Sequence, residues 1–399
     1  MRPSLEATMS KFPNFSSASH RDLFARCIAC TFGLSVVAVV GACARDATAP
    51  QSALTTAPAA GVQSDRQNGG DAGSATRYLI ADQFNNRVIE VDRAGNILWH
   101  FGRGPNDVSA ASIIGVNDAQ RVGDLTLMAG TGAPSGSEPN CPTGCADNRV
   151  ILVDPSGEIV WQYGKFGVTG AGRNELSSPV QNTWLPNGDV LITDQGNQRV
   201  IEVERRSRNI VWQYGITGVT GIGYNQLNNP NSAELLANGH VLISDENNNR
   251  AIEVNRDHQI LATYTAHGTV SGVAFASRLP DGHTLITDSN NNRIVEVDAG
   301  DNVVWEYATN TDPASNPNPL PTRAVRLADG GTLISDQFNH RVIVVSRSKA
   351  IVRSFGNLNL AGFGRRNASQ GLNGPYDAKV IGDFTGLTPP FSQGDQDRK

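Results

Sequence analysis

The feature that most restricts the fold is a motif that returns six times along the chain. Stretches such as LITDQGNQRVIEVERRSRNIVWQYG (191–215) and LITDSNNNRIVEVDAGDNVVWEYA (285–308) share the same order of apolar runs and turns. Self-similarity at a period of roughly 40 to 60 residues indicates repeated supersecondary units. The arginine that opens one of these runs recurs as Arg87, Arg149, Arg199, Arg250, Arg293 and Arg341.

Each unit predicts four short antiparallel strands. In the clearest copy, VQNTWL leads through Pro186-Asn187-Gly188 into DVLITD, and further turns lead into RVIEVE and IVWQYG. Short β-branched runs separated by Asn-Gly and Asp-Gly turns are typical of hairpins. Six such units predict an all-β fold, a six-bladed β-propeller of four-stranded antiparallel blades.

The two ends of the repeat region are complementary. The chain enters at RYLIADQ (77–83) without an inner strand, whereas GPYDAKVIGD (374–383) resembles the inner strands and has no strands after it. Joining them would complete one blade and hide two strand edges. We therefore expect a propeller over 77–384 whose ring is closed by its N- and C-terminal strands, followed by a C-terminal tail, 385–399.

The N-terminal region reads as a targeting segment. Arg21 and Arg26 precede the apolar stretch CIACTFGLSVVAVVGA (27–42), so residues 1–42 are predicted to be a signal peptide. Residues 43–76 are rich in Ala, Pro, Gly, Ser and Thr and cannot build a core, which predicts a flexible linker.

The junction VGAC (40–43) resembles the lipobox of bacterial lipoproteins. This resemblance implies a lipid on Cys43 and an outer-membrane lipoprotein of the cell envelope, facing the periplasm or the surface. The alternative is cleavage at a small residue near Gly41 and Ala42, which would release a secreted soluble protein.

Two cysteines remain in the expected mature domain, Cys141 and Cys145, in the loop SGSEPNCPTGC. A Pro-Gly turn between them and an oxidising compartment favour a disulfide. A metal site is disfavoured because no His and no further Cys lies beside them.

The stretch 163–215 carries an FG pair, a Gly-rich link, a Pro, an inner strand, a D-x-x-N-x-R turn and a closing aromatic-Gly. In this order the chain resembles the NHL-repeat six-bladed β-propellers over residues 77 to about 384. The resemblance implies the fold but leaves function open, because that family includes protein-binding and RNA-binding modules and an amidating lyase with metal in its channel.

Five units carry Asp, Asn and Arg at one strict spacing. The Asp can accept turn N–H groups, the Asn tolerates a left-handed conformation, and the Arg can pair with a carboxylate, so we predict a structural turn. A catalytic residue is usually needed once, whereas these recur with the repeat. In the second unit Gly130 replaces the Asp, and we expect the disulfide hairpin to replace the Asp-based turn. The sets are Asp82, Asn85 and Arg87; Asp194, Asn197 and Arg199; Asp245, Asn248 and Arg250; Asp288, Asn291 and Arg293; Asp336, Asn339 and Arg341.

Functional residues are expected where the repeat breaks its symmetry, around the central channel. Glu234 and Asp377 could hold Ca²⁺ there, as the related lactonase propellers do, although we predict no resident cofactor. Arg323 and Lys379 argue instead for an anion or a neutralised polar network. Aligning the inner strands on their turns gives the channel candidates Gln181, Thr183, Ser232, Glu234, Arg323, Asp377 and Lys379, with Phe275, Ser277 and Val325 in the same two slots.

The formal net charge of -5 and the lack of a clustered Lys/Arg patch exclude a nucleic-acid partner. The Gly-rich links FGVTGAGRNELSSP and ITGVTGIGYNQLNNP are expected on one face, where a protein or glycan would bind. We therefore expect a monomeric, non-catalytic binding module that touches the membrane only through its lipid anchor. The alternative is a channel enzyme, a metal-assisted lyase or a lactonase-like hydrolase that uses Glu234 and Asp377.

Overall fold

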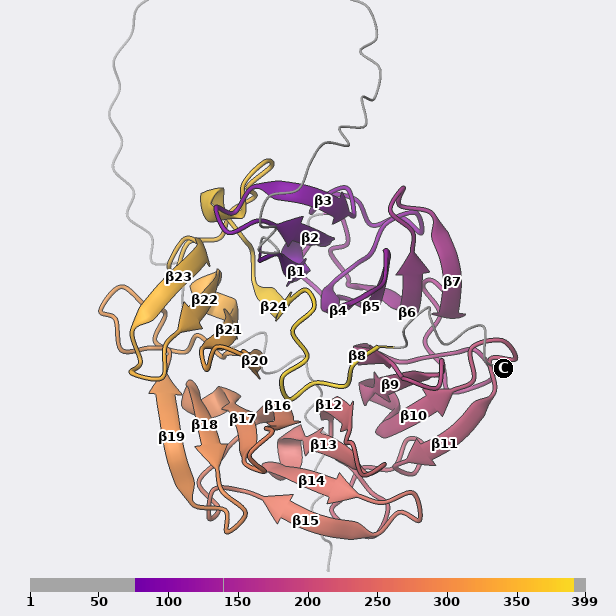
Figure 1. The fold of residues 1–399 in the computed structure, drawn as a ribbon. Helices are drawn as coiled ribbons and strands as arrows, with labels where there is room; N and C mark the ends of the chain where they lie inside the picture. The colour runs from indigo at the N-terminus through magenta and orange to yellow at the C-terminus, as the bar shows by residue number, and fades with distance from the viewer. Residues whose placement is uncertain (1–75, 139, 391–399) are drawn as a thin grey trace, which may run out of the picture. The chain divides into compact units, whose positions relative to one another are not determined.

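The computed structural model describes residues 76–138 and 140–390, and it confirms the six-bladed β-propeller. Six four-stranded antiparallel sheets, the blades, stand around a common centre (Figure 1). The expected signal peptide, Cys43 and nearly all of the expected linker lie outside the described residues. Within the part of the chain that the structure describes, no helix has the length and apolar character needed to cross a membrane.

In every blade the four strands follow one another from the centre of the ring outward, and they are named in that order. Blade 1 contains β24 (Pro375–Val380), β1 (Tyr78–Asp82), β2 (Arg87–Val91) and β3 (Ile97–Phe101), and blade 2 contains β4 (Val116–Val122), β5 (Leu125–Ala133), β6 (Cys145–Val153) and β7 (Ile159–Gly164). Blade 3 contains β8 (Pro179–Trp184), β9 (Val190–Asp194), β10 (Arg199–Val203) and β11 (Ile210–Tyr214), and blade 4 contains β12 (Pro230–Leu235), β13 (Val241–Asp245), β14 (Arg250–Val254) and β15 (Ile260–Tyr264). Blade 5 contains β16 (Val273–Arg278), β17 (Thr284–Asp288), β18 (Arg293–Val297) and β19 (Val303–Ala308), and blade 6 contains β20 (Arg323–Arg326), β21 (Thr332–Asp336), β22 (Arg341–Val345) and β23 (Ile351–Gly356).

The ring closes as expected from its complementary ends. Strand β24 pairs antiparallel with β1, with Tyr78 opposite Val380 and Ala81 opposite Asp377. Blade 1 is therefore built from both ends of the propeller, and this pairing covers the edges of β1 and β24 that would otherwise be exposed.

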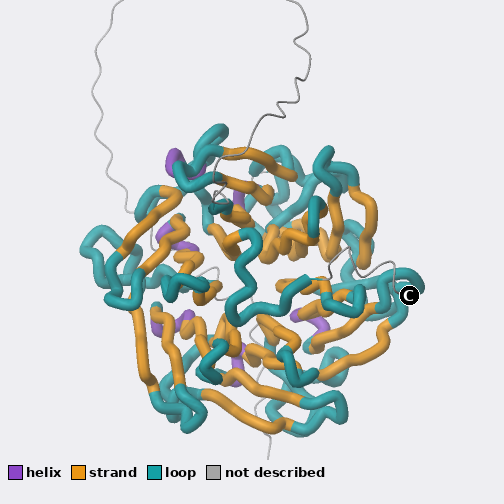
Figure 2. The backbone as a smooth tube through the Cα atoms, viewed as in Figure 1, coloured by secondary structure: helices purple, strands orange, loops and turns teal. Residues whose placement is uncertain are grey.

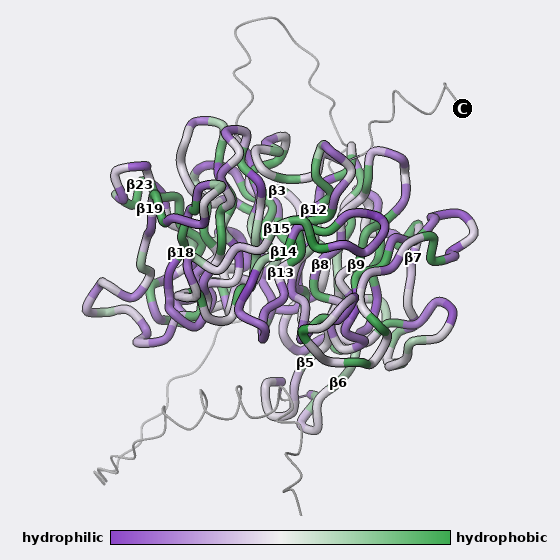
Figure 3. The backbone as a smooth tube through the Cα atoms, turned by 90° about the horizontal axis from the view of Figure 1, so that it is seen from below, coloured by the Kyte–Doolittle hydropathy of each residue, from purple (hydrophilic) through white to green (hydrophobic). Residues whose placement is uncertain are grey.

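The core lies between the blades rather than within one of them. Every residue of β2, β10 and β22 is buried, because a middle strand is covered by a neighbouring blade on each face. The buried apolar side chains form six clusters, and each cluster joins two consecutive blades. Figure 3 shows the resulting pattern, with apolar strands inside and polar loops outside.

The outer strands are also joined from blade to blade. A tryptophan of one blade donates its indole N–H to a backbone carbonyl in a turn of the next blade. In blade 6 Arg353 takes the place of this tryptophan and donates to the carbonyl of Arg93 in blade 1. The four tryptophan bonds run from Trp99 to Pro155 (3.1 Å), Trp161 to Arg205 (2.9 Å), Trp212 to Arg256 (3.2 Å) and Trp305 to Arg347 (3.0 Å).

The ring has two different faces, a turn face and a tail face. The turn face carries the five short 3-10 turns that follow the second strands, together with the Gly-rich links that pack on these turns. The tail face lies at the opposite ends of the inner strands, where residues 381–390 follow β24 (Figure 2). The turns are η1 (Gln83–Asn85), η2 (Gln195–Asn197), η3 (Glu246–Asn248), η4 (Ser289–Asn291) and η5 (Gln337–Asn339), and η6 (Ala368–Gln370) lies in the link before β24.

Candidate functional site

The repeated Asp, Asn and Arg lie together in buried turns on the turn face. In blade 3 the Nε of Arg199 and the Nδ2 of Asn197 each donate to Oδ2 of Asp194 at 2.8 Å. Burial raises the pKa of Asp194, and the charge of Arg199 opposes this rise. Asp194, Asn197 and Arg199 thus bond to one another within one turn, and we call this arrangement the latch. The Arg Nε to Asp Oδ2 distance is 2.8 Å for Arg87–Asp82, 2.7 Å for Arg250–Asp245, 2.6 Å for Arg293–Asp288 and 2.7 Å for Arg341–Asp336.

Blade 2 differs from the expectation that its disulfide hairpin replaces the Asp-based turn. The carboxylate is still present, but Asp147 of β6 supplies it. Asp147 pairs with Arg149 and accepts the N–H of Ile114 at 2.8 Å, as the turn Asp accepts an N–H in other blades. Cys141 and Cys145 are disulfide-bonded in the adjoining loop.

The residue between the Asn and the Arg of each turn also carries a repeated function, which the sequence pattern alone did not reveal. It adopts the left-handed conformation, with φ from 49° to 58°, and its side chain accepts a backbone N–H just before the inner strand of the next blade. The available signal was the recurrence of Asn, Gln or His at this one position. The six bonds join Asn86 to Gly115 (2.8 Å), Asn148 to Ser178 (2.8 Å), Gln198 to Asn229 (2.6 Å), Asn249 to Gly272 (2.8 Å), Asn292 to Leu320 (3.1 Å) and His340 to Gly374 (3.1 Å).

One of the two channel slots, the one that holds Asp377, Asp118, Gln181 and Ser232, joins the inner strands around the ring. An inner strand is the edge of its sheet, so its outward N–H groups need acceptors. Four slot side chains accept such an N–H from the next blade, which gives them a structural task. These bonds run from Ala119 to Asp377 (3.2 Å), Asn182 to Asp118 (3.2 Å), Ala233 to Gln181 (2.8 Å) and Ala276 to Ser232 (3.4 Å).

A compact charged cluster fills the middle of the channel. Arg323 reaches Asp118 and Asp377 at 2.9 Å each, and Lys379 reaches the same two carboxylates at 2.7 and 2.5 Å. The guanidinium of Arg323 also lies 4.3 Å from the ring centroid of Phe275. Two cations thus neutralise two anions in the channel interior, and three of the candidate residues, Arg323, Asp377 and Lys379, belong to this ionic network.

The two aspartates respond differently to this network. Burial alone would raise the pKa of Asp118, but the charges of Lys379 and Arg323 outweigh it and lower that pKa. For Asp377 burial dominates and raises the pKa against the same two charges. The two cations therefore stabilise the ionised form of Asp118 more strongly than that of Asp377.

Asp118 is central to this cluster, and the repeat alignment did not propose it. The inner strands were aligned on the Asp of the following turn, and blade 2 has Gly130 at that place. A different comparison carried the signal: VNDAQ (116–120) in blade 2 matches PYDAK (375–379) in blade 1. In this match Gln120 occupies the position that is equivalent to Lys379. Gln120 accepts the N–H of Trp184 at 2.7 Å.

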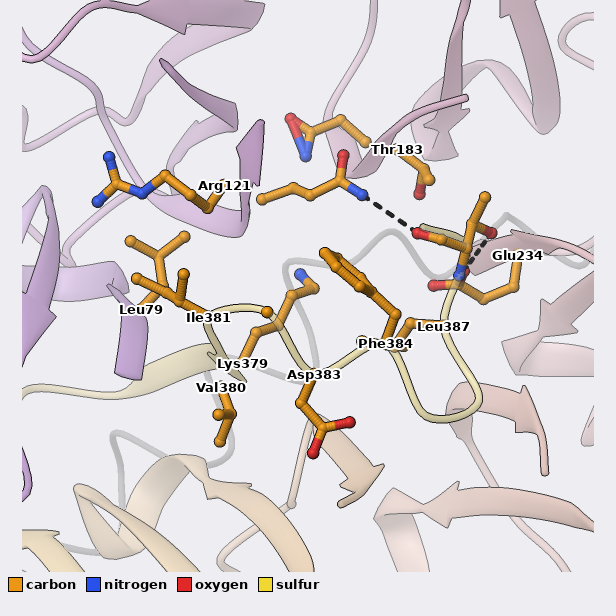
Figure 4. A pocket seen from close by; sticks show the side chains of 14 residues that line it. Leu79, Arg121, Thr183, Glu234, Lys379, Val380, Ile381, Asp383, Phe384 and Leu387 are labelled. Atoms are coloured by element: carbon orange, nitrogen blue, oxygen red, sulfur yellow. Dashed lines mark hydrogen bonds between the residues drawn. The ribbon is translucent and has the colours of Figure 1, made fainter. Parts of the chain in front are cut away.

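Glu234 lies apart from the ionic cluster, near the tail face. Its Oε1 accepts from Gln181 at 2.8 Å and its Oε2 accepts the N–H of Thr388 at 2.8 Å. Burial raises the pKa of Glu234, and the bonds from Thr388 oppose that rise. Thr183 and Glu234 both line a small pocket at this face (Figure 4).

The pocket beneath Thr388 is too small for a substrate. Its free volume is about 20 Å³, which corresponds to roughly one water molecule. The segment 381–390 covers it, so the expected domain boundary at residue 384 falls inside a segment that packs against the channel.

The candidate Ca²⁺ ligands are not brought together. Asp377 is held by Arg323 and Lys379, whereas Glu234 is bound by Gln181 and Thr388. Among the described residues, the one group of three His, Cys, Asp or Glu with ligand atoms within 4.8 Å of one another is Asp281, His283 and Glu296, outside the channel. Glu296 already pairs with Arg326 at 2.6 Å, so a further cation there would face an existing positive charge.

On the turn face, the two Gly-rich links expose apolar side chains. Ile222 is 65% exposed and Tyr224 is 70% exposed, both in the link between blades 3 and 4. The preceding link, between blades 2 and 3, exposes Val168. Exposed apolar side chains that lie close together mark surfaces for contact with a partner.

Fold and channel together define a six-bladed β-propeller whose channel is occupied by its own side chains. A protein of unknown function from Bacteroides caccae is 12% identical over 77% of this chain and 100% of its own, with a TM-score of 0.52. Virginiamycin B lyase from Staphylococcus aureus, in its selenomethionine form, is 14% identical over 72% of this chain and 87% of its own, with a TM-score of 0.45. The WD40 propeller domain of Doa1 is 13% identical over 69% and 80%, with a TM-score of 0.41. No protein-family model and no curated protein matches the sequence.

Proposed function

We propose that this chain is an exported, lipid-anchored, NHL-type β-propeller that acts as a non-catalytic, monomeric binding module. The proposal depends on one observation, which is that the charged side chains of the channel are already paired with other groups of the protein. Asp118, Asp377, Arg323 and Lys379 neutralise one another, and Glu234 is occupied by Gln181 and Thr388. Buried groups that are already paired within the fold are poor candidates for binding a substrate or a metal.

The point where the chain enters the propeller is compatible with an anchor. Arg77, at the start of the propeller, accepts the N–H of Ile381 through its carbonyl at 2.9 Å, so the chain enters on the tail face. A linker from a lipidated Cys43 would therefore join the propeller on the face opposite the Gly-rich links.

The turn face supports a polypeptide partner. The links 165–178 and 215–229 are close copies of each other and expose aliphatic groups beside Tyr224, among them Ile216 and Ile222. Aliphatic surface gains free energy when a protein partner covers it, whereas a glycan offers few apolar groups in return. We therefore assign this pair of links as the partner surface and take a glycan as the other outcome of the test.

Co-purification from detergent-solubilised envelope tests both parts. Ile222→Asp should abolish recovery of the partner, whereas Val304→Asp, on the outer strand β19 and 48% exposed, should leave it unchanged. Cys43→Ala should move the protein from the membrane to the soluble fraction while the partner is retained. Equal recovery with both surface variants would reject the partner surface.

Elemental analysis of the same purified protein tests the non-catalytic part. Stoichiometric Ca²⁺ or Zn²⁺ that is lost in Glu234→Ala would contradict a purely binding role and would favour a metal-assisted channel enzyme. A metal content that is the same in both proteins is expected.

A further inference from the structure

Residues 381–390, which we call the strap, cross the tail face of the ring. They leave blade 1 after β24 and pass over the centre, where the yellow chain is seen in Figure 1. Asp383 accepts the N–H of Ala328 in blade 6 at 2.8 Å. Thr388 then reaches blade 4, so the strap spans the channel mouth from one side to the other.

Thr388 has a partner for each of its polar groups. Its N–H and its hydroxyl both donate to Oε2 of Glu234, at 2.8 and 2.6 Å. The hydroxyl oxygen accepts the N–H of Leu235 at 3.0 Å, and the carbonyl accepts from Gln120 at 3.4 Å. The tail-face mouth of the channel therefore forms hydrogen bonds with both the backbone and the hydroxyl of this one residue.

The rest of the strap buries little surface. Thr388 is the one residue of the strap that is buried, with 3% exposure, while Phe384 lines the pocket and keeps 36% of its surface exposed (Figure 4). The strap contains no strand, and under it lies the pocket of about 20 Å³. Segments with few buried apolar contacts open locally at low free-energy cost. We therefore expect the strap to open without disturbing the blades.

We propose that the tail-face mouth is a recognition site for a serine or threonine residue in an extended peptide, and that Thr388 occupies this site in cis. A hydroxyl serves as donor to Glu234 and as acceptor from Leu235 at once, which an aliphatic side chain cannot do. Without that acceptor the N–H of Leu235, at the edge of β12, would be buried and unpaired. This site is independent of the partner surface on the turn face.

A fluorescent peptide of sequence DFTGLTPP, residues 383–390 of this chain, is the probe for full-length protein in a fluorescence-anisotropy titration. Thr388→Val keeps the shape of the side chain but removes the hydroxyl, so the strap competes less. We expect the apparent Kd of the peptide to fall by about tenfold relative to wild type. Thr385→Val is the matched control and should bind like wild type, because Thr385 lies in the same strap and its half-buried side chain is not part of the bonding around Glu234.

Two further comparisons decide the chemistry. Adding Glu234→Gln to Thr388→Val should weaken peptide binding again. Gln181 and Thr388 bond different oxygens of Glu234, and an amide has only one acceptor oxygen. On wild-type protein at high concentration, the peptide with valine in place of its second threonine should bind at least tenfold more weakly, whereas serine there should retain binding. The wild-type comparison remains valid if a variant folds poorly.

Hydrogen exchange shows whether the strap moves. In Thr388→Val the amides of 381–388 should lose protection while the β-strand amides keep theirs. The proposal is overturned if Thr388→Val binds the peptide no more tightly than wild type. It is also overturned if the valine-substituted peptide binds as tightly as the threonine peptide, or if the amides of the strap stay protected in Thr388→Val.

Discussion

Gly130 and Asp147 face each other in blade 2, at the place where the other blades need a single aspartate. A Cβ built on Gly130 would overlap with Oδ2 of Asp147, closer than any real contact allows. The carboxylate therefore comes from Asp147 on the third strand, β6. The second strand, β5, has a glycine at this point, which leaves room for that carboxylate. The latch is preserved by moving the acid from one strand to its neighbour.

Gly130→Ala should consequently destabilise the protein. The new methyl group would push against a buried carboxylate that is already bonded to Arg149 and to the N–H of Ile114, so overpacking should cost about 1–3 kcal/mol of unfolding free energy. Urea denaturation measures this loss. Gly300→Ala is the control, because its neighbour within 3 Å is the end of the exposed Asn302 side chain, which can move aside. Equal losses in the two variants would contradict this account.

Arg199→Met should cost more than the same change at Arg293. The side chain of Arg199 is 3% exposed and that of Arg293 is 23% exposed, so Asp194 is left with less access to water than Asp288. Removing one partner of a buried pair costs about 3–5 kcal/mol, and solvent screening reduces that cost at Arg293.

The loss in Arg199→Met should also depend on pH. Burial already raises the pKa of Asp194, and the loss of Arg199 removes a charge that lowers it. A carboxyl whose pKa is higher folded than unfolded destabilises the fold once it ionises, so the loss should be largest at pH 7 and should shrink toward pH 4. A constant loss between these values would show that the aspartate is not the cause.

The fold could be predicted from the sequence because the same pattern of strands and turns recurs in every unit of the repeat. Strand pattern, turns and the complementary ends all pointed to one ring, and pairing of β24 with β1 followed. The channel network could be predicted only in part, because Arg323, Asp377 and Lys379 were among the channel candidates but Asp118 was not. Asp118 and Arg323 meet only through the curvature of the ring, and Thr388 lies in a segment with no repeat to mark it. Symmetry shows which residues build the blades, but contacts across the ring require the three-dimensional structure.

Glu138 should make the loop beside the disulfide sensitive to pH. Its carboxylate accepts from Asn86 at 3.2 Å, and burial raises its pKa to about 7. The unfolding free energy should fall as pH rises from about 4.5 to about 7, because the folded state holds this proton more tightly. Glu138→Gln should therefore gain stability relative to wild type at pH 8 but not at pH 4.5. Thermal unfolding at both values measures the gain, and Glu306→Gln, on the exposed outer strand, should show none.

His340 should make the ring closure sensitive to acid. It occupies the left-handed position of the blade 6 turn, and its Nδ1 accepts the N–H of Gly374, directly before the closing strand β24. Burial lowers the pKa of His340 to about 4. A protonated imidazole has no acceptor nitrogen, so protonation would break the bond that positions β24.

The sign of the effect follows from the two pKa values of His340. Unfolded histidine takes up its proton near pH 6.5, whereas the folded side chain resists until about pH 4, so stability should be lost as pH falls through this window. His340→Asn keeps an acceptor, since Asn86, Asn249 and Asn292 do the same task in other blades, but it cannot titrate. The variant should match wild type at pH 7 and exceed it in unfolding free energy at pH 4.5. Hydrogen exchange of residues 375–380 should show the same difference, and identical acid profiles for the two proteins would refute the role of His340.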